Sequence, residues 1–338
     1  MKFRDYLQTH FTRNGINFFA LEVLLRPTRA HQSSFWSPKE PPRQKSLLPL
    51  AKALCRQSLI YAILLLIFMT SCVSSTHQSK EKTVLLAILA RNKAHTLPRY
   101  LRCIENLDYD KGAIAIYINT NNNKDETEEI LKLWIERNRH LYKEVIYENH
   151  NIAELTETNP HEWDSKRFSV LGKIRNKSMQ KAIEHECDYY FVVDCDNFIA
   201  PMTLKTLVEK DKPIIAPILR SIPEKSDSYS NYFCDYTEDG YYKTHHDYPY
   251  ILYRLYIGCF KVPVVHCTYL IKSEYLDQLN YQDGTYDFEF VIFSRGAREK
   301  NIDQYICNER EFGVQVHFLE NLTLEEEARV LQPFLSIP

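Results

Sequence analysis

The sequence predicts an α/β fold in which a mostly parallel sheet is flanked by helices and preceded by one membrane-anchor segment. The first observation is an unbroken apolar run at 83–90, the length of a strand buried on both faces. The second is that strand-like and helix-like patterns alternate from there to residue 193, as right-handed crossovers require. The third is that polar clusters follow three of the four strands, where ligands bind in such folds.

The first strand and helix cover residues 83–107. The strand ends at Arg91-Asn92-Lys93. Pro98 then lies in the first turn of a helix, a position that tolerates its missing N–H. The apolar face of this helix consists of Leu97, Leu101, Ile104 and Leu107.

A second strand and helix follow. Residues 114–118 are the strand, and residues 121–124 are a polar turn. Asp125 is the expected N-cap of the helix, with Glu128 as its N3 partner in a capping box. The apolar stripe of this helix consists of Ile130, Leu131, Trp134 and Ile135.

The third and fourth strands are expected at 145–147 and 189–193, with a long amphipathic helix between them. The positions in register along that helix are Leu171, Ile174, Ser178, Ala182 and Ile183. The fourth strand runs directly into Asp194-Cys195-Asp196-Asn197. Near the end of the chain, Thr323 is expected to cap a closing helix, with Glu326 at N3.

Residues 1–56 are predicted to be a basic tail. They hold ten Lys or Arg and three Asp or Glu, a charge of +7, so the net −2 of the chain leaves −9 for the remainder. Prolines interspersed with Ser, Gln and Arg indicate that this tail has no core of its own. Because the folded part is acidic, we do not expect the protein to bind nucleic acid.

Residues 57–79 carry no Asp, Glu, Lys or Arg, and 59–69 are continuously apolar. An uncharged stretch of about twenty residues can cross a bilayer, so we expect a transmembrane signal-anchor there. A cleaved signal peptide and a buried core helix are the alternatives. The positive-inside rule puts the tail in the cytoplasm and residues 80–338 across the membrane. The predicted protein is single-pass type II in the ER or Golgi lumen, with a bacterial membrane-associated protein as the alternative.

Glycine and cysteine spacings exclude several kinds of site. The chain has eight glycines, and the two closest to each other are Gly284 and Gly296. Neither a dinucleotide-binding turn nor a P-loop is therefore encoded. Nine cysteines without a C-x-x-C spacing argue against a zinc ribbon or a thioredoxin-like motif. Any phosphate must be held in another way.

Asp194 and Asp196 lie at i and i+2 where the chain leaves a buried strand. Two such carboxylates can share a Mn²⁺ or Mg²⁺ ion whose remaining ligands are phosphate oxygens and waters. The metal would then supply the charge that binds a diphosphate. A solvated turn is the plainer alternative, and a phosphatase nucleophile motif is a third.

Several stretches resemble known glycosyltransferases. Residues 121–127 are similar to a turn of family-two members, and Asp-x-Asp follows the fourth strand in the GT-A fold. More closely, residues 83–332 resemble the N-terminal domain of procollagen galactosyltransferases. The matching stretches are 85–98, 188–197, 230–234, 240–243, 258–266 and 305–313. The resemblance implies a GT-A domain that uses a UDP-sugar and Mn²⁺ and transfers galactose, with inversion, to hydroxylysine in collagen-like acceptors.

These inferences assign a role to each candidate residue. Asp194 and Asp196 are the expected metal ligands. The expected contacts to the nucleotide-sugar come from Arg91, Asn92, Thr120, Asn121, Arg175 and Asp194. An inverting transfer needs a carboxylate base for the acceptor hydroxyl, and the candidates are Asp287 and Glu289. Asp287 is preferred because the resemblance aligns it with the second Asp of a Phe-Asp-Asp stretch. Arg175 is placed on the polar side of its helix, where a plain surface arginine is the alternative.

The leading functional prediction is thus a metal-dependent glycosyltransferase domain spanning residues 80–338. A hydroxyl-bearing acceptor and a membrane reached through residues 57–79 are its expected partners. The alternative from another class is a non-catalytic relative that keeps the fold as a binding or adhesion module.

Overall fold

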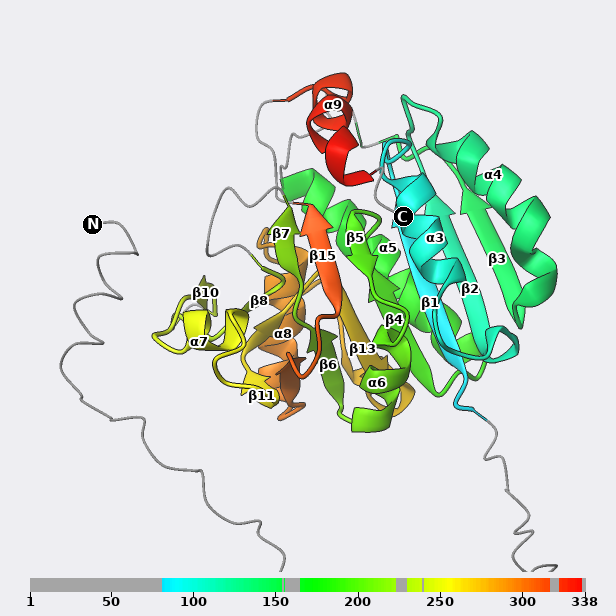
Figure 1. The fold of residues 1–338 in the computed structure, drawn as a ribbon. Helices are drawn as coiled ribbons and strands as arrows, with labels where there is room; N and C mark the ends of the chain where they lie inside the picture. Colours follow the sequence, from blue (N-terminus) through cyan, green and yellow to red (C-terminus); the bar gives the residue numbers. More distant parts are fainter. Residues whose placement is uncertain are drawn as a thin grey trace, which may run out of the picture. The chain divides into compact units, whose positions relative to one another are not determined.

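The computed structural model describes residues 81–153, 155, 165–222, 230–238, 240–316 and 322–335 (Figure 1). The predicted tail and anchor, residues 1–56 and 57–79, lie outside these ranges. Within the described ranges, no helix has the length and apolarity needed to cross a membrane.

The predicted α/β class is confirmed by an eight-stranded, mostly parallel sheet. Its order is β11-β14-β6-β13-β4-β1-β2-β3. The four predicted strands are β1 (Val84–Ala90), β2 (Ile114–Thr120), β3 (Glu144–Asn149) and β4 (Tyr189–Val193). They are mutually parallel in the spatial order β4-β1-β2-β3. The carboxyl ends of all four therefore meet at one edge of the sheet.

The other half of the sheet mixes directions. Its strands are β6 (Ile214–Pro217), β11 (Cys259–Val262), β13 (Thr268–Lys272) and β14 (Gln304–Cys307). Strand β13 is antiparallel to β4 on one side and to β6 on the other, with Thr268 opposite Val193. Strand β14 is parallel to β6, and the edge strand β11 is antiparallel to β14.

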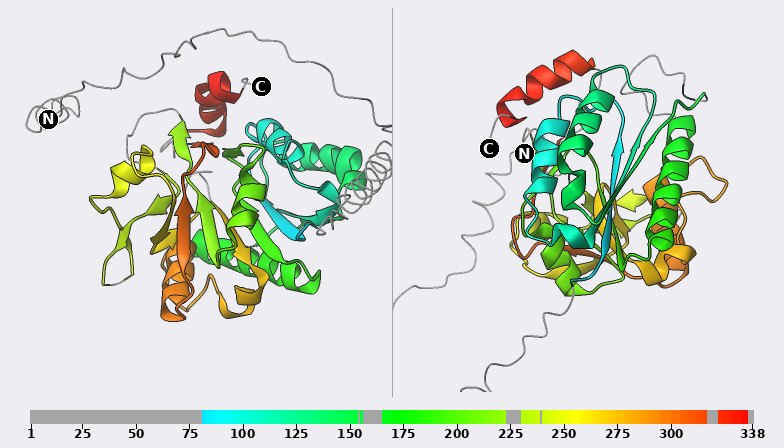
Figure 2. Two further views of the ribbon diagram at one scale, coloured as in Figure 1. Left: turned by 60° about the horizontal axis from the view of Figure 1, so that its bottom comes forward. Right: turned by 90° about the vertical axis from the view of Figure 1, so that its right-hand side faces the viewer.

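Helices cover both faces of this sheet (Figure 2). One face packs on α3 (Leu97–Glu105), α4 (Thr127–Asn138) and α6 (Thr203–Lys210), and the other on α5 (Ser165–Glu184) and α8 (Glu289–Glu299). Along β1, Val84, Leu86 and Ile88 belong to the first core, whereas Leu85 and Ala87 belong to the second. Burial on both faces explains why the apolar run of β1 is unbroken.

Smaller elements complete the domain. Strands β5 (Asn197–Ile199), β15 (Gly313–Val316) and β7 (Arg220–Ile222) form a three-stranded sheet, in which β15 is central. Two short pairs are β8 (Tyr232–Phe233) with β12 (Val264–Val265), and β9 (Asp235–Tyr236) with β10 (Tyr242–Lys243). The remaining elements are α7 (Tyr248–Leu252), α9 (Leu324–Leu335) and the 3₁₀ turns η1 (Lys111–Ala113), η2 (Arg139–Leu141) and η3 (Ser273–Gln278).

One of the two predicted capping boxes forms. Before α9, the backbone N–H of Thr323 donates to Glu326 Oε2 at 2.8 Å, and the N–H of Glu326 donates to Thr323 Oγ1 at 3.2 Å. Before α4 the prediction was wrong, because Glu126 is the N-cap and has no side-chain capping bond. Asp125 instead accepts from the backbone N–H groups of Thr127 and Ala94. The Asp125 carboxylate therefore bonds both to the start of α4 and to the loop after β1.

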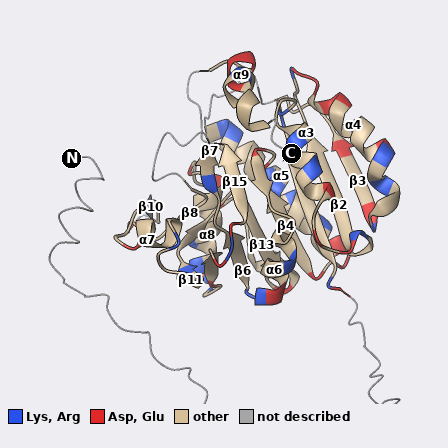
Figure 3. Ribbon diagram, viewed as in Figure 1, with Lys and Arg blue, Asp and Glu red and all other residues tan. Residues whose placement is uncertain are grey.

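Helix α4 is a charged surface helix. Glu128 and Glu129 lie in its first turn and Arg137 in its last. Figure 3 shows acidic and basic residues along this helix. This order places negative charge at the positive end of the helix dipole and positive charge at the negative end.

The buried face of α5 differs in part from the predicted one. Ser178 and Ala182 are buried as expected, but Ile183 is 38% exposed. Arg175 is only 4% exposed, so its placement on the polar side of the helix was wrong and the surface-arginine alternative is excluded. The hydrophobic pattern predicts a polar position for an arginine, and here tertiary ion pairs satisfy the charge instead.

Candidate active site

The three polar clusters predicted at strand ends lie on adjacent strands. Arg91 and Asn92 follow β1, Asn121 follows Thr120 at the end of β2, and Asp194 follows β4. Because the three strands are parallel neighbours, their ends are brought together as the sequence predicts.

The loops after β1 and β2 are joined to each other by hydrogen bonds between backbone and side chains. These bonds run from Asn92 N–H to Asn123 Oδ1 (3.0 Å), Lys124 N–H to Asn92 Oδ1 (2.8 Å), Lys93 N–H to Thr127 Oγ1 (2.7 Å) and Ala94 N–H to Asp125 Oδ2 (3.0 Å). Asn92 has φ 53°, a left-handed conformation that asparagine tolerates better than most residues. The two loops therefore form a single unit at the edge of the sheet.

Asp194 is held by an ion pair with α5. Arg175 Nη2 donates to both carboxylate oxygens, at 3.0 and 3.4 Å, and the backbone N–H of Asp194 donates to the carbonyl of Cys267 at 3.1 Å. Desolvation raises the pKa of the Asp194 carboxyl; the Arg175 guanidinium opposes this rise, and the Asp196 carboxylate adds to it. Two acids at close quarters thus favour a cation between them.

Asp196 is paired with Lys93, a residue that the sequence analysis did not single out. Lys93 Nζ lies 2.7 Å from Asp196 Oδ2. Desolvation lowers the pKa of Lys93, but the carboxylates of Asp196 and Glu327 outweigh it, so the net shift is upward. Glu327, on α9, also lies 3.3 Å from Nε2 of His95. Lys93 directly follows Arg91-Asn92 at the end of β1, and this position could have identified it as a site residue from the sequence.

Arg175 connects Asp194 to Glu289. Its Nε lies 3.5 Å from Glu289 Oε1, at the first residue of α8. Glu289 is 5% exposed, and its burial raises the pKa of the carboxyl, an effect that Arg175 opposes. Carboxylates from β4 and α8 therefore share one buried guanidinium.

Asp287 belongs to a different group of charges. Its Oδ2 accepts from Arg295 Nη2 at 2.8 Å, and Arg295 also donates to Asp283 at 2.7 Å. The two candidate bases, two residues apart in the sequence, thus have different partners.

Asn121 and Arg175, both proposed to bind the donor, have buried polar atoms with no hydrogen-bond partner among the described residues. These atoms include Oδ1 of Asn121 and Nη1 of Arg175. Thr120 Oγ1, by contrast, accepts from Asn123 Nδ2 at 2.6 Å. Buried polar groups are almost always satisfied, so a bound molecule is a reasonable source of the missing partners.

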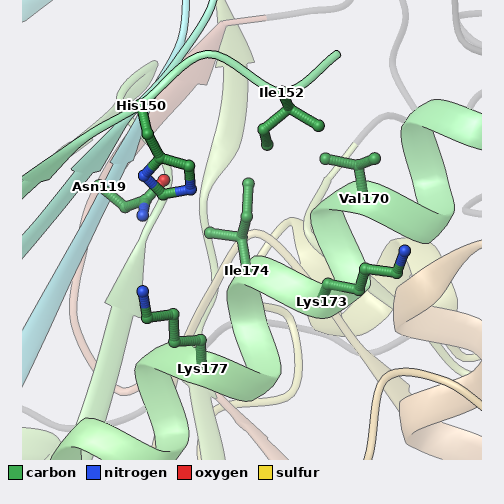
Figure 4. A pocket seen from close by; sticks show the side chains of 7 residues that line it. All are labelled: Asn119, His150, Ile152, Val170, Lys173, Ile174 and Lys177. Carbon is green, nitrogen blue, oxygen red and sulfur yellow. The ribbon is translucent and has the colours of Figure 1, made fainter. Parts of the chain in front are cut away.

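A cavity of about 210 Å³ lies between α5 and the ends of β2 and β3 (Figure 4). Its lining residues are Asn119, His150, Ile152, Val170, Lys173, Ile174 and Lys177. Lys173 and Lys177 give it two cationic groups (Figure 4). The cavity shares α5 with the Arg175 ion pairs and was not predicted from the sequence.

The donor set at the end of β4 fits a divalent cation. Asp194 and Asp196 offer carboxylate oxygens, which Mg²⁺ and Mn²⁺ prefer. Such ions are commonly held by one or two carboxylates together with phosphate oxygens of a substrate, so two acids are sufficient on the protein side.

Comparisons with known proteins agree with the resemblance noted in the sequence. Procollagen galactosyltransferase 2 of mouse is 37% identical over 263 residues, covering 75% of this chain and 41% of the relative. The human protein of the same name is 38% identical over 259 residues, covering 73% and 41%. A mouse protein named inactive glycosyltransferase 25 family member 3 is 31% identical over 276 residues, covering 78% and 46%. The chain thus spans about two fifths of the length of the curated relatives it matches first.

Solved structures are more distant. Residues 1–349 of S. aureus TarS, in complex with UDP-GlcNAc, align with a TM-score of 0.47 at 14% identity, over 72% of this chain and 60% of that one. At this level of likeness nothing about ligand or reaction follows for the present chain. The family model, in contrast, matches residues 81–333 under the description "Glycosyltransferase family 25, N-terminal domain". The chain therefore belongs to glycosyltransferase family 25, through the N-terminal domain of that family.

Proposed function

We propose that residues 80–338 are a metal-dependent glycosyltransferase domain of the GT-A type, which transfers a sugar from a UDP-sugar to a hydroxyl group. The observation that carries this proposal is the pair Asp194 and Asp196 at the end of β4, in contact with the buried Arg175 of α5 and with Lys93 of the β1 loop. Family membership supports the same class of reaction.

The donor would be held by charge and by the unsatisfied polar atoms. Asp194 and Asp196 are the proposed ligands of Mn²⁺ or Mg²⁺, which when bound neutralises the diphosphate and favours its departure. Among the residues that the structure describes, Nη1 of Arg175 has no hydrogen-bond partner and can donate to an anionic oxygen. Oδ1 of Asn121 likewise has no partner there and can accept from a uracil or ribose donor. Arg91, Asn92 and Thr120 complete the proposed donor contacts.

The acceptor hydroxyl must lose its proton to a base as it attacks the anomeric carbon. Glu289 is supported by its burial, its raised pKa and its link through Arg175 to Asp194. A carboxylate with a raised pKa is the better proton acceptor near neutral pH. Asp287 is the second candidate, because its partner is Arg295 and it has no such link to Asp194 through Arg175. This order is the reverse of the sequence prediction.

Galactose is the first donor sugar to consider and a collagen-like protein the first acceptor, because two relatives at 37–38% identity are named procollagen galactosyltransferases. Hydroxylysine and inversion follow from the same resemblance. Attachment through residues 57–79 and residence in the ER or Golgi lumen complete the proposal.

The second candidate function is a non-catalytic binding module with the same fold. The observation that favours it is the 31% identity to a mouse relative whose name calls it inactive.

The decisive experiment measures UDP release by the purified chain with Mn²⁺ over a panel of UDP-sugars. A hydroxylysine-containing collagen peptide serves as acceptor, and the double variant Asp194→Asn, Asp196→Asn serves as control. We expect release above the control for at least one sugar, and an increase when the peptide is added. The binding module would be favoured if the wild type and the double variant released equal UDP for every sugar while the wild type still bound UDP.

A further inference from the structure

Two cysteines face each other at the edge of the large sheet. Cys259 opens β11 and Cys307 ends β14, and the two residues are directly opposite in the antiparallel register. Both are thiols in this structure, with the sulfur atoms 2.9 Å apart. None of the proposed functions uses them.

The backbone geometry at this pair suits a cross-link. The neighbouring pair, Gly258 and Asn308, is bonded through Asn308 N–H and the carbonyl of Gly258 at 3.0 Å. Because bonded and non-bonded pairs alternate along an antiparallel ladder, Cys259 and Cys307 form a non-hydrogen-bonded pair. In such pairs the Cα atoms are roughly 4.5 Å apart and the side chains are closest, within the range that a disulfide spans.

A metal site is the competing explanation, because Glu309 lies nearby, with Oε1 3.9 Å from the sulfur of Cys259. Its other oxygen is 2.6 Å from Lys210 Nζ, so its charge is already matched. Two thiolates bound tetrahedrally to one zinc ion at ~2.3 Å would be roughly 3.8 Å apart. The two sulfurs here are much closer than that.

We propose that Cys259 and Cys307 are joined by a disulfide when the protein folds in an oxidising compartment. The oxidant is a disulfide, either of a small thiol such as glutathione or of an oxidoreductase. The half-exposed Cys259 thiolate attacks one sulfur of that disulfide, forming a mixed disulfide and releasing one thiol of the oxidant. The Cys307 thiolate then attacks the Cys259 sulfur and releases the second thiol. Two cysteine S–H bonds are lost, one S–S bond forms, and two electrons and two protons pass to the oxidant.

The environment of Cys307 supports its role in the second step. The backbone N–H of Glu309 donates to its sulfur and favours the thiolate, against the effect of burial on the pKa of this thiol. This bond does not depend on the S–H of Cys259, which the first step consumes. Its side chain is fully buried next to the half-exposed Cys259. Once Cys259 has reacted, the nearest nucleophile is therefore Cys307.

The cross-link would lie at the base of an exposed apolar loop, residues 253–258. Leu255 and Ile257 are 69% and 62% exposed in this loop. Asn308, next to Cys307, anchors the loop through bonds from its Nδ2 to the carbonyls of Ile251 and Tyr256. A disulfide adjacent to Asn308 would keep this anchoring in place, because it ties the edge strand β11 to β14.

The test is a peptide map of the full chain made in a eukaryotic secretory pathway, and of the same chain refolded in a glutathione redox buffer. Free thiols are alkylated before digestion without reductant. We expect a linked peptide pair containing Cys259 and Cys307, which separates on reduction. Alkylation of both residues in both preparations would overturn the proposal. Stoichiometric zinc that is retained by the wild type and lost in Cys259→Ala would overturn it as well, in favour of the metal site.

Variants supply the second measurement. Cys259→Ala should leave Cys307 as a thiol and lower the melting temperature by roughly 5–10 °C relative to the oxidised wild type. Reduction should lower the melting temperature of the wild type by a similar amount and leave that of Cys259→Ala unchanged. Cys103→Ala is the matched control, since Cys103 has no cysteine partner among the described residues, and it should keep the response of the wild type to reductant.

Discussion

Single side chains at the proposed site form two groups of ion pairs, one around Arg175 and one between Lys93 and Asp196. Glu289 contacts Arg175, which binds Asp194, while Lys93 binds the neighbouring Asp196. Removing one partner of a buried pair leaves the other charge uncompensated, which costs several kcal/mol. The carboxylate whose loss disturbs the fold least is Asp196, because it and its partner Lys93 are each about a quarter exposed.

Replacement of Asp196 by Asn tests the proposed metal site. We expect Asp196→Asn to raise the Kd for UDP in Mn²⁺ at least ~100-fold, about 2.7 kcal/mol, because the cation loses a charged ligand. Isothermal titration calorimetry measures this effect. The melting temperature without metal should stay close to that of the wild type.

Substitution of Lys93, the ion-pair partner of Asp196, tests the same metal site from the other side of the pair. In Lys93→Met the carboxylates keep their positions but lose a competing cation, so Mn²⁺ affinity should increase. Unchanged Mn²⁺ affinity in both variants would show that Asp196 is not a metal ligand.

The two candidate bases can be separated by comparing kcat with donor affinity. Glu289→Gln should reduce transfer by ~10² or more, the usual scale for loss of a general base, while the Kd for the UDP-sugar changes less than about threefold. Asp287→Asn is the control, with the same chemical change two residues away. If Asp287→Asn is the inactive variant instead, the base is Asp287 and the sequence prediction stands.

At the scale of elements, the second sheet depends on a glycine. Gly313 begins β15 with φ +133°, and a Cβ there would lie 2.1 Å from the carbonyl oxygen of Phe198 on β5. This contact and the positive φ leave no room for another residue. Because β5 directly follows Asp194-Cys195-Asp196, the glycine also supports the backbone that carries the proposed ligands.

A pair of glycine substitutions tests this explanation. Gly313→Ala should lower the free energy of unfolding by at least ~2 kcal/mol, since backbone must move to accept the methyl group. Gly296→Ala should raise it by roughly 0.5–1 kcal/mol, because Gly296 lies within α8 and a methyl group added there would meet nothing within 4 Å. Urea unfolding measures both. Equal effects of the two substitutions would contradict the role assigned to the β5–β15 contact.

At the scale of the whole molecule, one buried histidine should make stability depend on pH. His266 stacks on Phe233 and Phe290, with ring centroids 5.5 and 4.8 Å away. Burial, reinforced by the charge of Arg175, lowers the pKa of His266 to about 4. In the unfolded chain a histidine has a pKa of about 6.5.

The sign of this effect follows from proton uptake. Between pH 6.5 and 4 the unfolded chain binds a proton at this position and the folded protein does not, so stability falls as the pH falls. The loss attributable to His266 is about 2 kcal/mol at pH 5 and is absent at pH 8. We expect His266→Phe, which keeps an aromatic ring in the stack, to lose correspondingly less stability between pH 8 and pH 5. Denaturation curves of the wild type and His266→Phe, recorded at pH 8 and at pH 5, check this. Equal losses of unfolding free energy in the two proteins would contradict it.

The sequence by itself determined the class of the fold, the strands β1 to β4 and the position of the Asp pair. Strand length, an unbroken apolar run and helical periodicity are local properties, so Val84–Ala90 and Tyr189–Val193 are recognisable without knowing their neighbours. Only the tertiary structure decided which residues surround Asp194 and Asp196. Strand β13 inserts antiparallel beside β4, Arg175 turns inward to ion pairs, and Glu289 arrives from a helix 95 residues after Asp194. Contacts of this kind depend on packing between distant segments. The ion pairing that allows a charged side chain to be buried therefore cannot be recognised from the local pattern of residues.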